Sequence, residues 1–259
     1  MSTTQILPNS LDVSRTPGIP LGRLVRVELR KMVDTRAGMW LMIAMVAISV
    51  VAVTIFGFAA HDQDKTFGNF MQFAGTPQGF LLPVLGILLV TQEWSQRTAM
   101  VTFTHEPRRA RVLAAKVYAA LLIGLAAIAI AFVLGALATI AFGHGHGFDN
   151  TSGLDFAKFG ILQGLVILQG LAYGLLFLNS GAAIVLYFVV PQVIGIVTHL
   201  VTGLHSAAPW IDFGQAQGHL SSSGNLSGLE WSQLLVTGLT WVVLPFIIGL
   251  WRVRRPEVK

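Results

Sequence analysis

Long apolar runs alternate with polar segments along this 259-residue chain, and the alternation predicts membrane-spanning helices. The runs approach or exceed the roughly 20 residues that a helix needs to cross the hydrocarbon core of a bilayer. They do not alternate residue by residue, as the strands of a transmembrane barrel would. The sequence therefore predicts an all-α membrane protein. Its six expected spans cover residues 37–60, 72–93, 117–142, 159–178, 182–201 and 233–251.

Three segments outside these spans have patterns of their own. Residues 1–19 are polar and contain Pro8 and Pro17, so we expect a disordered tail, followed by a single membrane domain from residue 20 to 259. Residues 20–36 place apolar side chains on one face at helical spacing, which predicts an amphipathic helix in the membrane interface. Residues 202–231 carry no Lys or Arg. We expect this segment to contact the outer interface of the membrane through its tryptophans.

Basic residues are distributed unevenly among the polar segments. Of the 17 Lys and Arg residues, all but Lys65 and Lys158 lie before the first span, between the second and third spans, or after the sixth. Basic segments remain on the cytoplasmic side of a membrane. The sequence therefore predicts a multi-pass membrane protein with both termini in the cytoplasm; that the membrane is the plasma membrane of a bacterium is implied by the resemblance described below. The net charge of +5 is explained by this topology, so we expect no nucleic-acid partner.

Several sequence signatures of catalysis are absent. The chain has no cysteine, which excludes disulfides and thiolate metal sites. It has no GxxxxGK[ST] phosphate loop, no HExxH and no GxSxG, so we expect no ATP hydrolysis by this chain and no bound cofactor or metal. His144 and His146 lie in a Gly-rich segment and would form a poor metal site. The sequence alone does not show whether they bind a metal.

Polar residues within the predicted spans are few. An interior almost without ionisable groups argues against a proton-coupled transporter and against an intramembrane protease. Gln163, Gln169, Gln192 and His199 can each hydrogen-bond between helices or contact a substrate. Gln169 and Gln192 are the candidates for a substrate path.

Small residues four positions apart occur twice in the fourth predicted span. The two pairs are Gly160 with Gly164 and Gly170 with Gly174. Such spacing allows helices to approach closely. We expect packing inside the bundle, with a dimer contact as the alternative.

The segment 91–116, TQEWSQRTAMVTFTHEPRRARVLAAK, places a dense basic cluster between two spans. Together with RLVRVELRKMVDTRAGMW before the first span and the ending WVVLPFIIGLWRVRRPEVK, it resembles the permease subunits of type-2 ABC exporters in their actinobacterial form. The resemblance extends from about Leu21 to Lys259. The residues that match the family pattern are Glu93, Thr98, Pro107, Arg109 and Lys116. Arg97 stands where that pattern has Gly.

This resemblance implies a fold and a mechanism. The permease would act as a dimer, with itself or a homologue, beside two copies of a separate ATPase that binds ATP and Mg. The segment between the fifth and sixth spans would be re-entrant, and the substrate would be hydrophobic or amphipathic: a drug, lipid, glycan or peptide. The segment after the second span would dock on the ATPase. Phe103 is then the expected anchor, because interface energy concentrates in buried aromatic residues, and the alternative is that this segment only caps the permease's own bundle. The residues expected in this ATPase-coupling loop are Glu93, Arg97, Thr98, Met100, Val101, Phe103, Pro107, Arg108, Arg109 and Lys116.

Two other functions remain open at this point. A membrane-embedded, lipid-modifying enzyme would need convergent acid, base or metal groups near an interface. The candidates for such groups are Asp149, Asp155, His205, Asp212 and His219, which show no motif spacing. A non-transporting immunity or sensor subunit built on the same fold is the second alternative.

Overall fold

The computed structural model describes residues 19–96, 98, 108–143, 147–149, 152–222 and 224–254, and within these ranges the chain forms helices and no strand. Six helices in this part of the chain are long and apolar enough to cross a membrane, as the sequence predicted. This indicates a multi-pass membrane protein. The six helices are α2 (Arg36–Ala59), α3 (Phe67–Ser95), α5 (Arg109–Phe142), α6 (Gly153–Phe177), α7 (Ser180–Leu200) and the helix Gly228–Val253.

Shorter helices lie between and before these six. The sixth long helix is made of α10 (Gly228–Gly238), a π-helical turn η3 (Leu239–Val243) and α11 (Leu244–Arg254). The remaining helices are α1 (Leu21–Asp34), η1 (Asp62–Asp64), η2 (Thr202–Leu204), α8 (Ala208–Ile211) and α9 (Phe213–Ser221). The helix predicted over residues 20–36 is thus present as α1.

Several long helices extend beyond the predicted spans. α5 begins at Arg109 rather than near residue 117, and α6 begins at Gly153 rather than near residue 159. The start of α6 is stabilised by a capping box, in which Ser152 and Asp155 satisfy each other's backbone N–H groups. The sequence placed Lys116 at a span boundary and Lys158 in a polar loop. In the structure both residues lie inside helices and are buried.

The pair α3 and α6 forms the centre of the bundle. A Cβ atom on Gly170 would lie under 3.0 Å from the carbonyl oxygen of Pro83, and one on Gly86 would clash with the backbone of Ile167. Gly174 packs less tightly on Ile87, where a Cβ atom would lie 3.0 Å from the carbonyl oxygen. The second predicted small-residue pair, Gly170 with Gly174, therefore packs inside the bundle as expected. Gly164 has no atom within 4 Å of its Cβ position, so the first pair does not make such a contact.

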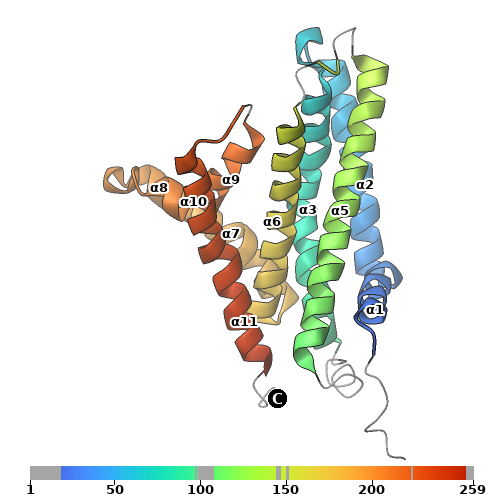
Figure 1. Ribbon diagram of the computed structural model, residues 1–259, viewed down its shortest axis with the longest axis vertical. Coiled ribbons are helices and arrows are strands. Elements are labelled where there is room, and N and C mark those ends of the chain that lie inside the picture. Colours follow the sequence, from blue (N-terminus) through green and yellow to red (C-terminus); the bar gives the residue numbers. More distant parts are fainter. Residues whose placement is uncertain are drawn as a thin grey trace, which may run out of the picture.

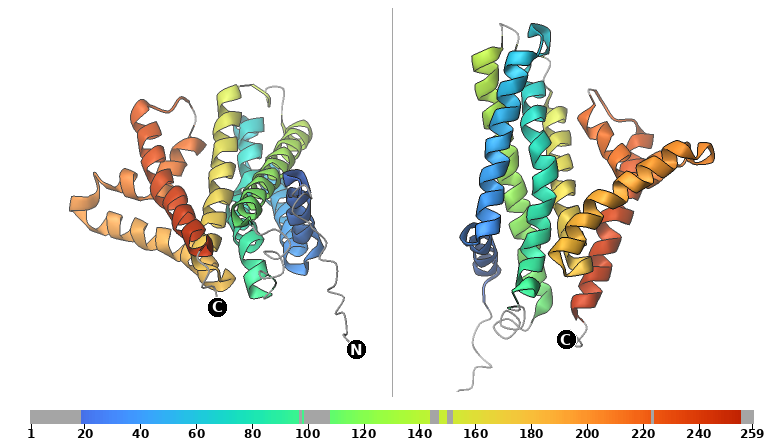
Figure 2. Two further views of the ribbon diagram at one scale, coloured as in Figure 1. Left: turned by 60° about the horizontal axis from the view of Figure 1, so that its bottom comes forward. Right: turned by 180° about the vertical axis from the view of Figure 1, so that it is seen from behind.

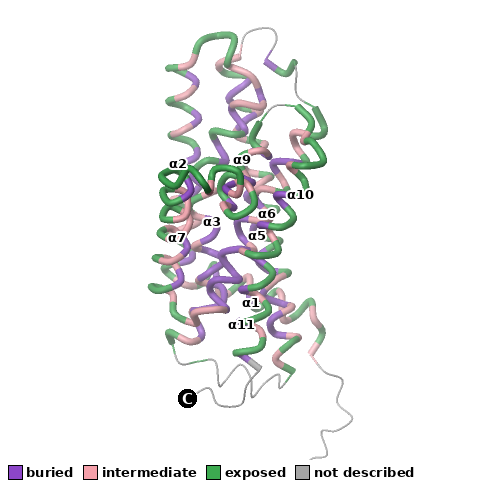
Figure 3. Tube along the Cα trace, turned by 90° about the vertical axis from the view of Figure 1, so that its left-hand side faces the viewer, coloured by how far each residue is buried: buried purple, intermediate pink, exposed green. Residues whose placement is uncertain are grey.

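The remaining helices surround this pair unequally. α2 and α5 pack on one side of α3 and α6, with α1 across one end, while α7 and α8–α11 lie on the other side of α6 (Figures 1 and 2). Buried residues concentrate along the inner helices, whereas α7 is largely exposed (Figure 3). α9 returns against α6 and α10 through Phe213, Ala216 and Leu220.

The basic segments come together at one end of the bundle, which we call the basic end. The start of α1, the end of α3, the start of α5 and the end of α11 all lie there (Figure 1). Nη2 of Arg111 donates to the carbonyl oxygen of Ile19 at 2.6 Å, and Nη1 of Arg109 donates to that of Val253 at 2.5 Å. The α2–α3 and α5–α6 connections meet at the opposite end, where the N–H of Phe67 donates to the carbonyl of Gly147. The two ends of the bundle therefore differ in charge, and Arg109 and Arg111 lie at the basic end.

Candidate functional site

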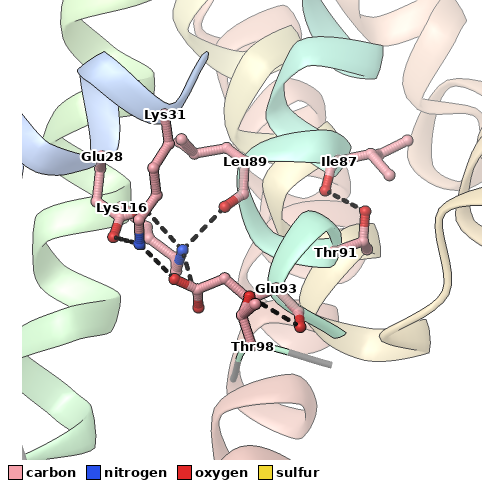
Figure 4. Close-up of polar contacts among 8 residues, drawn as sticks. All are labelled: Glu28, Lys31, Ile87, Leu89, Thr91, Glu93, Thr98 and Lys116. Carbon is pink, nitrogen blue, oxygen red and sulfur yellow. Dashed lines mark hydrogen bonds and ion pairs between the residues drawn. The ribbon is translucent and has the colours of Figure 1, made fainter. Parts of the chain in front are cut away.

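Four charged side chains meet at the basic end and form what we call the charge ring: Glu28 and Lys31 of α1, Glu93 of α3 and Lys116 of α5 (Figure 4). Nζ of Lys31 lies 2.8 Å from Oε1 of Glu28 and 2.5 Å from Oε1 of Glu93. Nζ of Lys116 lies 2.7 Å from Oε2 of Glu28 and 3.3 Å from Oε2 of Glu93. Each carboxylate therefore bridges both ammonium groups, and charges of opposite sign alternate around the ring.

Lys116 is the most completely enclosed ammonium of the ring. Its side chain is 4% exposed, and besides the two carboxylates it donates to the carbonyl oxygen of Leu89 at 3.0 Å. An ammonium group has three N–H donors. All three have acceptors here, two from α3 and one from α1. Lys116 therefore joins α5 to both helices at once.

The ring is electrically neutral, and this explains how it can be buried. A single buried ion loses several kcal/mol of hydration, which only close partners of opposite charge can offset. The side chains of Glu28 and Glu93 are almost fully enclosed, while Lys31 keeps contact with solvent. Burial alone would lower the pKa of Lys31, but its Coulombic and hydrogen-bonding contacts with Glu28 and Glu93 outweigh burial and raise that pKa above its ordinary value.

Further contacts anchor both ends of the segment that connects α3 to α5. Nε2 of Gln92 donates to Oγ1 of Thr35 at 3.2 Å, which ties α3 to the corner between α1 and α2. The N–H of Thr98 donates to the carbonyl oxygen of Glu93 at 2.9 Å, directly beyond the end of α3. At the other end, the ring residue Lys116 and the α5 arginines hold the start of α5 against α1 and α11. Both ends of the connection are therefore bonded, directly or through the ring, to α1 or its flanking residues.

The predicted coupling residues divide into two groups. Glu93 and Lys116 are ring members, Thr98 follows the end of α3, and Arg108 and Arg109 stand at the start of α5. The structure thus brings Glu93 and Lys116 together. The other predicted residues, Arg97, Met100, Val101, Phe103 and Pro107, lie outside the described residues.

Sequence reasoning missed two members of the ring. It treated Lys31 as one of several basic residues of an interfacial helix, and it did not consider Glu28. A signal was available, because Glu28 lies four residues after Leu24 and four before Met32, on the apolar face of α1. A charge on such a face is buried only with a partner, and Glu28 has two, Lys31 and Lys116.

The polar residues predicted within the spans have different surroundings. Nε2 of Gln163 donates to Oε1 of Gln78 at 2.7 Å, and Nε2 of Gln78 donates to the carbonyl oxygen of Ala127 at 3.0 Å. This buried chain joins α6, α3 and α5, which is the interhelical role considered for Gln163. Gln169 is buried in α6, whereas Gln192 is exposed on α7 and lines a cavity of about 470 Å³ that Gln169 does not reach.

In the part of the chain that the structure describes, no group of three or more His, Asp or Glu side chains is placed to hold a metal ion. His144 and His146 lie outside that part. Comparisons of the chain with protein-family models and with curated proteins give no match.

Proposed function

We propose that this chain is the membrane-spanning subunit of an ATP-driven ABC transporter that exports a hydrophobic or amphipathic substrate. The observation that carries the proposal is the charge ring. It ties the two helix ends that flank the α3–α5 connection to α1 and to each other. A partner that pulls on this connection would move three helices together rather than one.

The proposal needs an outside source of energy. A transporter does work only if its partner binds one conformation more strongly than another. The chain has no phosphate loop, so we assign ATP and Mg to a separate ATPase, present in two copies beside a dimer of this permease or of this chain with a homologue. The sequence supports docking through Phe103, since interface energy concentrates in buried aromatic residues.

The proposed topology places the basic end in the cytoplasm of a bacterial cell. Fifteen of the 17 Lys and Arg residues lie in the three segments that meet at that end or extend from it, and basic segments remain inside. The segment from η2 to α9 then lies toward the outer side as a re-entrant element, with α1 in the cytoplasmic interface. Trp210 and Trp231 are each more than one-third exposed, which suits the headgroup level.

The docking step can be tested by co-purification of the permease with the phosphate-loop ATPase encoded beside it. Phe103→Ala should weaken association by about 30-fold, equivalent to about 2 kcal/mol, and should reduce substrate-stimulated ATP hydrolysis. Phe58→Ala is a matched control, because Phe58 is 77% exposed at the opposite end of the bundle. Unchanged association and hydrolysis in Phe103→Ala would remove the docking role.

Arg108 offers a separate test of electrostatic steering. It stands at the start of α5 and is exposed, whereas Arg109 also bonds the end of α11. Arg108→Glu should therefore weaken ATPase association. The loss should diminish at high salt, because exposed charges are screened.

Cysteine labelling tests the topology, since the chain has no native cysteine. In intact cells, a membrane-impermeant maleimide should label Cys at positions 64 and 225 and should not label Cys at positions 100 and 257. Strong labelling at position 100 in intact cells would contradict the proposed orientation.

A further inference from the structure

A cavity lies where α3 and α6 face α7 and α9, toward the end of the bundle opposite the charge ring. We call it the groove cavity. Its volume is about 440 Å³, and α3, α6, α7 and α9 all contribute to its lining. This volume falls within the range of about 300–1,000 Å³ that is typical of small-ligand sites.

The polar side chains that line the groove cavity are uncharged. They are Gln72 and Thr76 of α3, Gln163 of α6, Tyr187 of α7, and Gln217 and Ser221 of α9. Amide and hydroxyl groups can both donate and accept hydrogen bonds. No Lys, Arg, Asp or Glu is among the lining residues, so a charged ligand would find no counter-charge there.

One of these amide groups lacks a partner. Among the described residues, Nε2 of Gln217 is a buried side-chain atom without a hydrogen-bond partner in the protein. Leaving a buried donor unpaired destabilises a folded protein. Unpaired buried polar groups are therefore rare and favour the interpretation that a ligand supplies the acceptor.

The neighbouring amides are held in place. Gln163 is fixed by its hydrogen bond to Gln78, and Nε2 of Gln72 donates to the carbonyl oxygen of Ser221 at 3.3 Å. The second contact joins α3 to the end of α9 and so closes one side of the cavity. Gln72 and Gln163 are thus held in place, whereas Gln217 is not.

The apolar lining points to an amphiphile rather than a free polar solute. Phe159 and Val166 lie on the α6 wall, and Phe80 on α3 is 60% exposed at the outside of the bundle. A hydrocarbon chain could leave the cavity past Phe80. The rest of the ligand would stay beside the amides.

An adjoining cavity of about 210 Å³ makes an anionic headgroup unfavourable. It shares Gln72, Phe159 and Ser221 with the groove cavity and contains Asp149 and Asp155. The nearby ammonium of Lys158 is already bound, at 3.1 Å from Oδ1 of Asp155 and at 2.6 Å from the carbonyl oxygen of Ser222. A phosphate headgroup would therefore have to compete with Asp155 and with the carbonyl oxygen of Ser222 for this ammonium.

We propose that the groove cavity binds an uncharged amphiphile whose headgroup carries hydroxyl groups, of the class of a monoglycosyl diacylglycerol. The site itself follows from the cavity and its lining. That its ligand is the exported cargo rests on the function proposed above.

The test measures lipid binding to the permease alone, in nanodiscs of phosphatidylcholine. Monoglucosyl diacylglycerol and phosphatidylglycerol with identical acyl chains are added separately, and retained lipid is counted by native mass spectrometry. The wild type should retain the glycolipid at least about tenfold better than phosphatidylglycerol, because burying an unpaired charge is unfavourable. Equal retention, or preference for phosphatidylglycerol, would overturn the proposal.

Two variants locate the site. Gly79 lines the cavity and has no atom within 4 Å of its Cβ position, so Gly79→Leu should fill the cavity and reduce glycolipid retention at least about tenfold. Gly164→Leu is the matched control, because Gly164 has the same open surroundings and is not a lining residue. Equal retention by Gly79→Leu and the control would overturn the assignment.

Gln217→Leu gives a test that does not depend on filling space. It should weaken glycolipid retention about threefold to tenfold, because one hydrogen bond to a neutral group is lost. It should also leave the melting temperature unchanged or raise it, because the unpaired buried donor is removed. Weakened folding with unchanged retention would mean that Gln217 is structural only, and would overturn its assigned role.

The assay contains no ATPase and no ATP, so the two proposals fail separately. Loss of glycolipid selectivity would remove this site and leave the ATPase docking untouched. Absence of an ATPase partner would remove the transporter assignment and leave the lipid site.

Discussion

At the basic end of the bundle, four charged side chains, three of them buried, pair with one another, whereas toward the opposite end a neutral cavity keeps the amide nitrogen of Gln217 without a protein partner. Both regions bury polar groups that are unfavourable in a membrane protein unless they are bonded. In the charge ring, every ammonium faces two carboxylates. In the groove cavity, the bonding capacity of the lining is incomplete.

This difference separates two uses of buried polarity. A saturated, neutral ring holds helices in one arrangement, because removal of any member leaves an unpaired charge. An unsaturated neutral lining leaves bonds for a molecule that enters from outside. The charge ring is thus suited to mechanical connection and the groove cavity to recognition. Substitutions in the two regions should differ accordingly.

The largest effect is expected from Lys116→Met, which keeps most of the stem and removes the enclosed ammonium. Glu28 and Glu93 would each lose a partner, and breaking a buried ion pair costs about 3–5 kcal/mol. Thermal unfolding in nanodiscs measures this loss of stability. Arg30→Met is the control, because its pair with Asp34 is exposed, at 81% and 61%, and should contribute about 0–1 kcal/mol.

A second substitution sharpens that result. Adding Glu28→Gln to Lys116→Met removes one carboxylate and restores neutrality, so part of the lost stability should return. Equal losses in Lys116→Met and Arg30→Met would show that the ring has no special role.

The glycine contact between the two regions should give the next largest effect. Gly170→Ala places a Cβ atom against the backbone of Pro83 and should cost about 1–3 kcal/mol, because neither helix can yield without repacking. Gly164→Ala meets nothing and should be neutral or slightly stabilising. Melting temperatures of the two variants provide the comparison. A similar loss in both would mean that helix propensity, not the α3–α6 contact, determines the cost.

The sequence predicted the six long helices and the shared basic end, because hydropathy and charge are local properties. It could not pair Glu28 with Lys116, since that contact joins helices distant along the chain. It placed Lys158 in a loop because a hydropathy pattern ends a span at the first charge. The helix continues there because Asp155 and the carbonyl oxygens of Ser222 and Gly224 satisfy the ammonium.

The groove cavity was beyond sequence reasoning for the same reason. It exists because α9 folds back beside α6, which brings Gln217 and Ser221 to Gln72. The predicted substrate-path pair, Gln169 and Gln192, relied on polarity alone, and polarity does not reveal which residues share a cavity. Only the packing of α9 beside α6 shows which residues share the groove cavity.

An effect of similar size is expected from the buried amides beneath the groove cavity. Gln78→Leu leaves the amide of Gln163 without its acceptor and should cost about 1–3 kcal/mol, as should Gln163→Leu. The double variant should cost less than the sum, because neither amide is then left unpaired. A double-mutant cycle by thermal unfolding measures the coupling. Strict additivity would contradict direct pairing of the two amides.

The smallest effect concerns Lys31, the ring member that remains partly exposed, at 33%. Its pKa is raised in the folded protein, because Glu28 and Glu93 outweigh the opposing effect of burial. Protonated Lys31 therefore favours the folded state. Its contribution is fully present below the ordinary pKa of 10.5 and is lost as the pH rises through the higher folded value. Solvent screening limits this contribution to about 1 kcal/mol.

Wild type and Lys31→Met should accordingly differ in stability by a constant amount from about pH 6 to about pH 9, and the difference should shrink only above about pH 10.5. Melting temperatures across this range test the sign and the window together. A difference that already falls between about pH 6 and about pH 9 would require another titrating group to control the contribution of Lys31. In that case the charge ring would not be the fixed connection that distinguishes the basic end from the groove cavity.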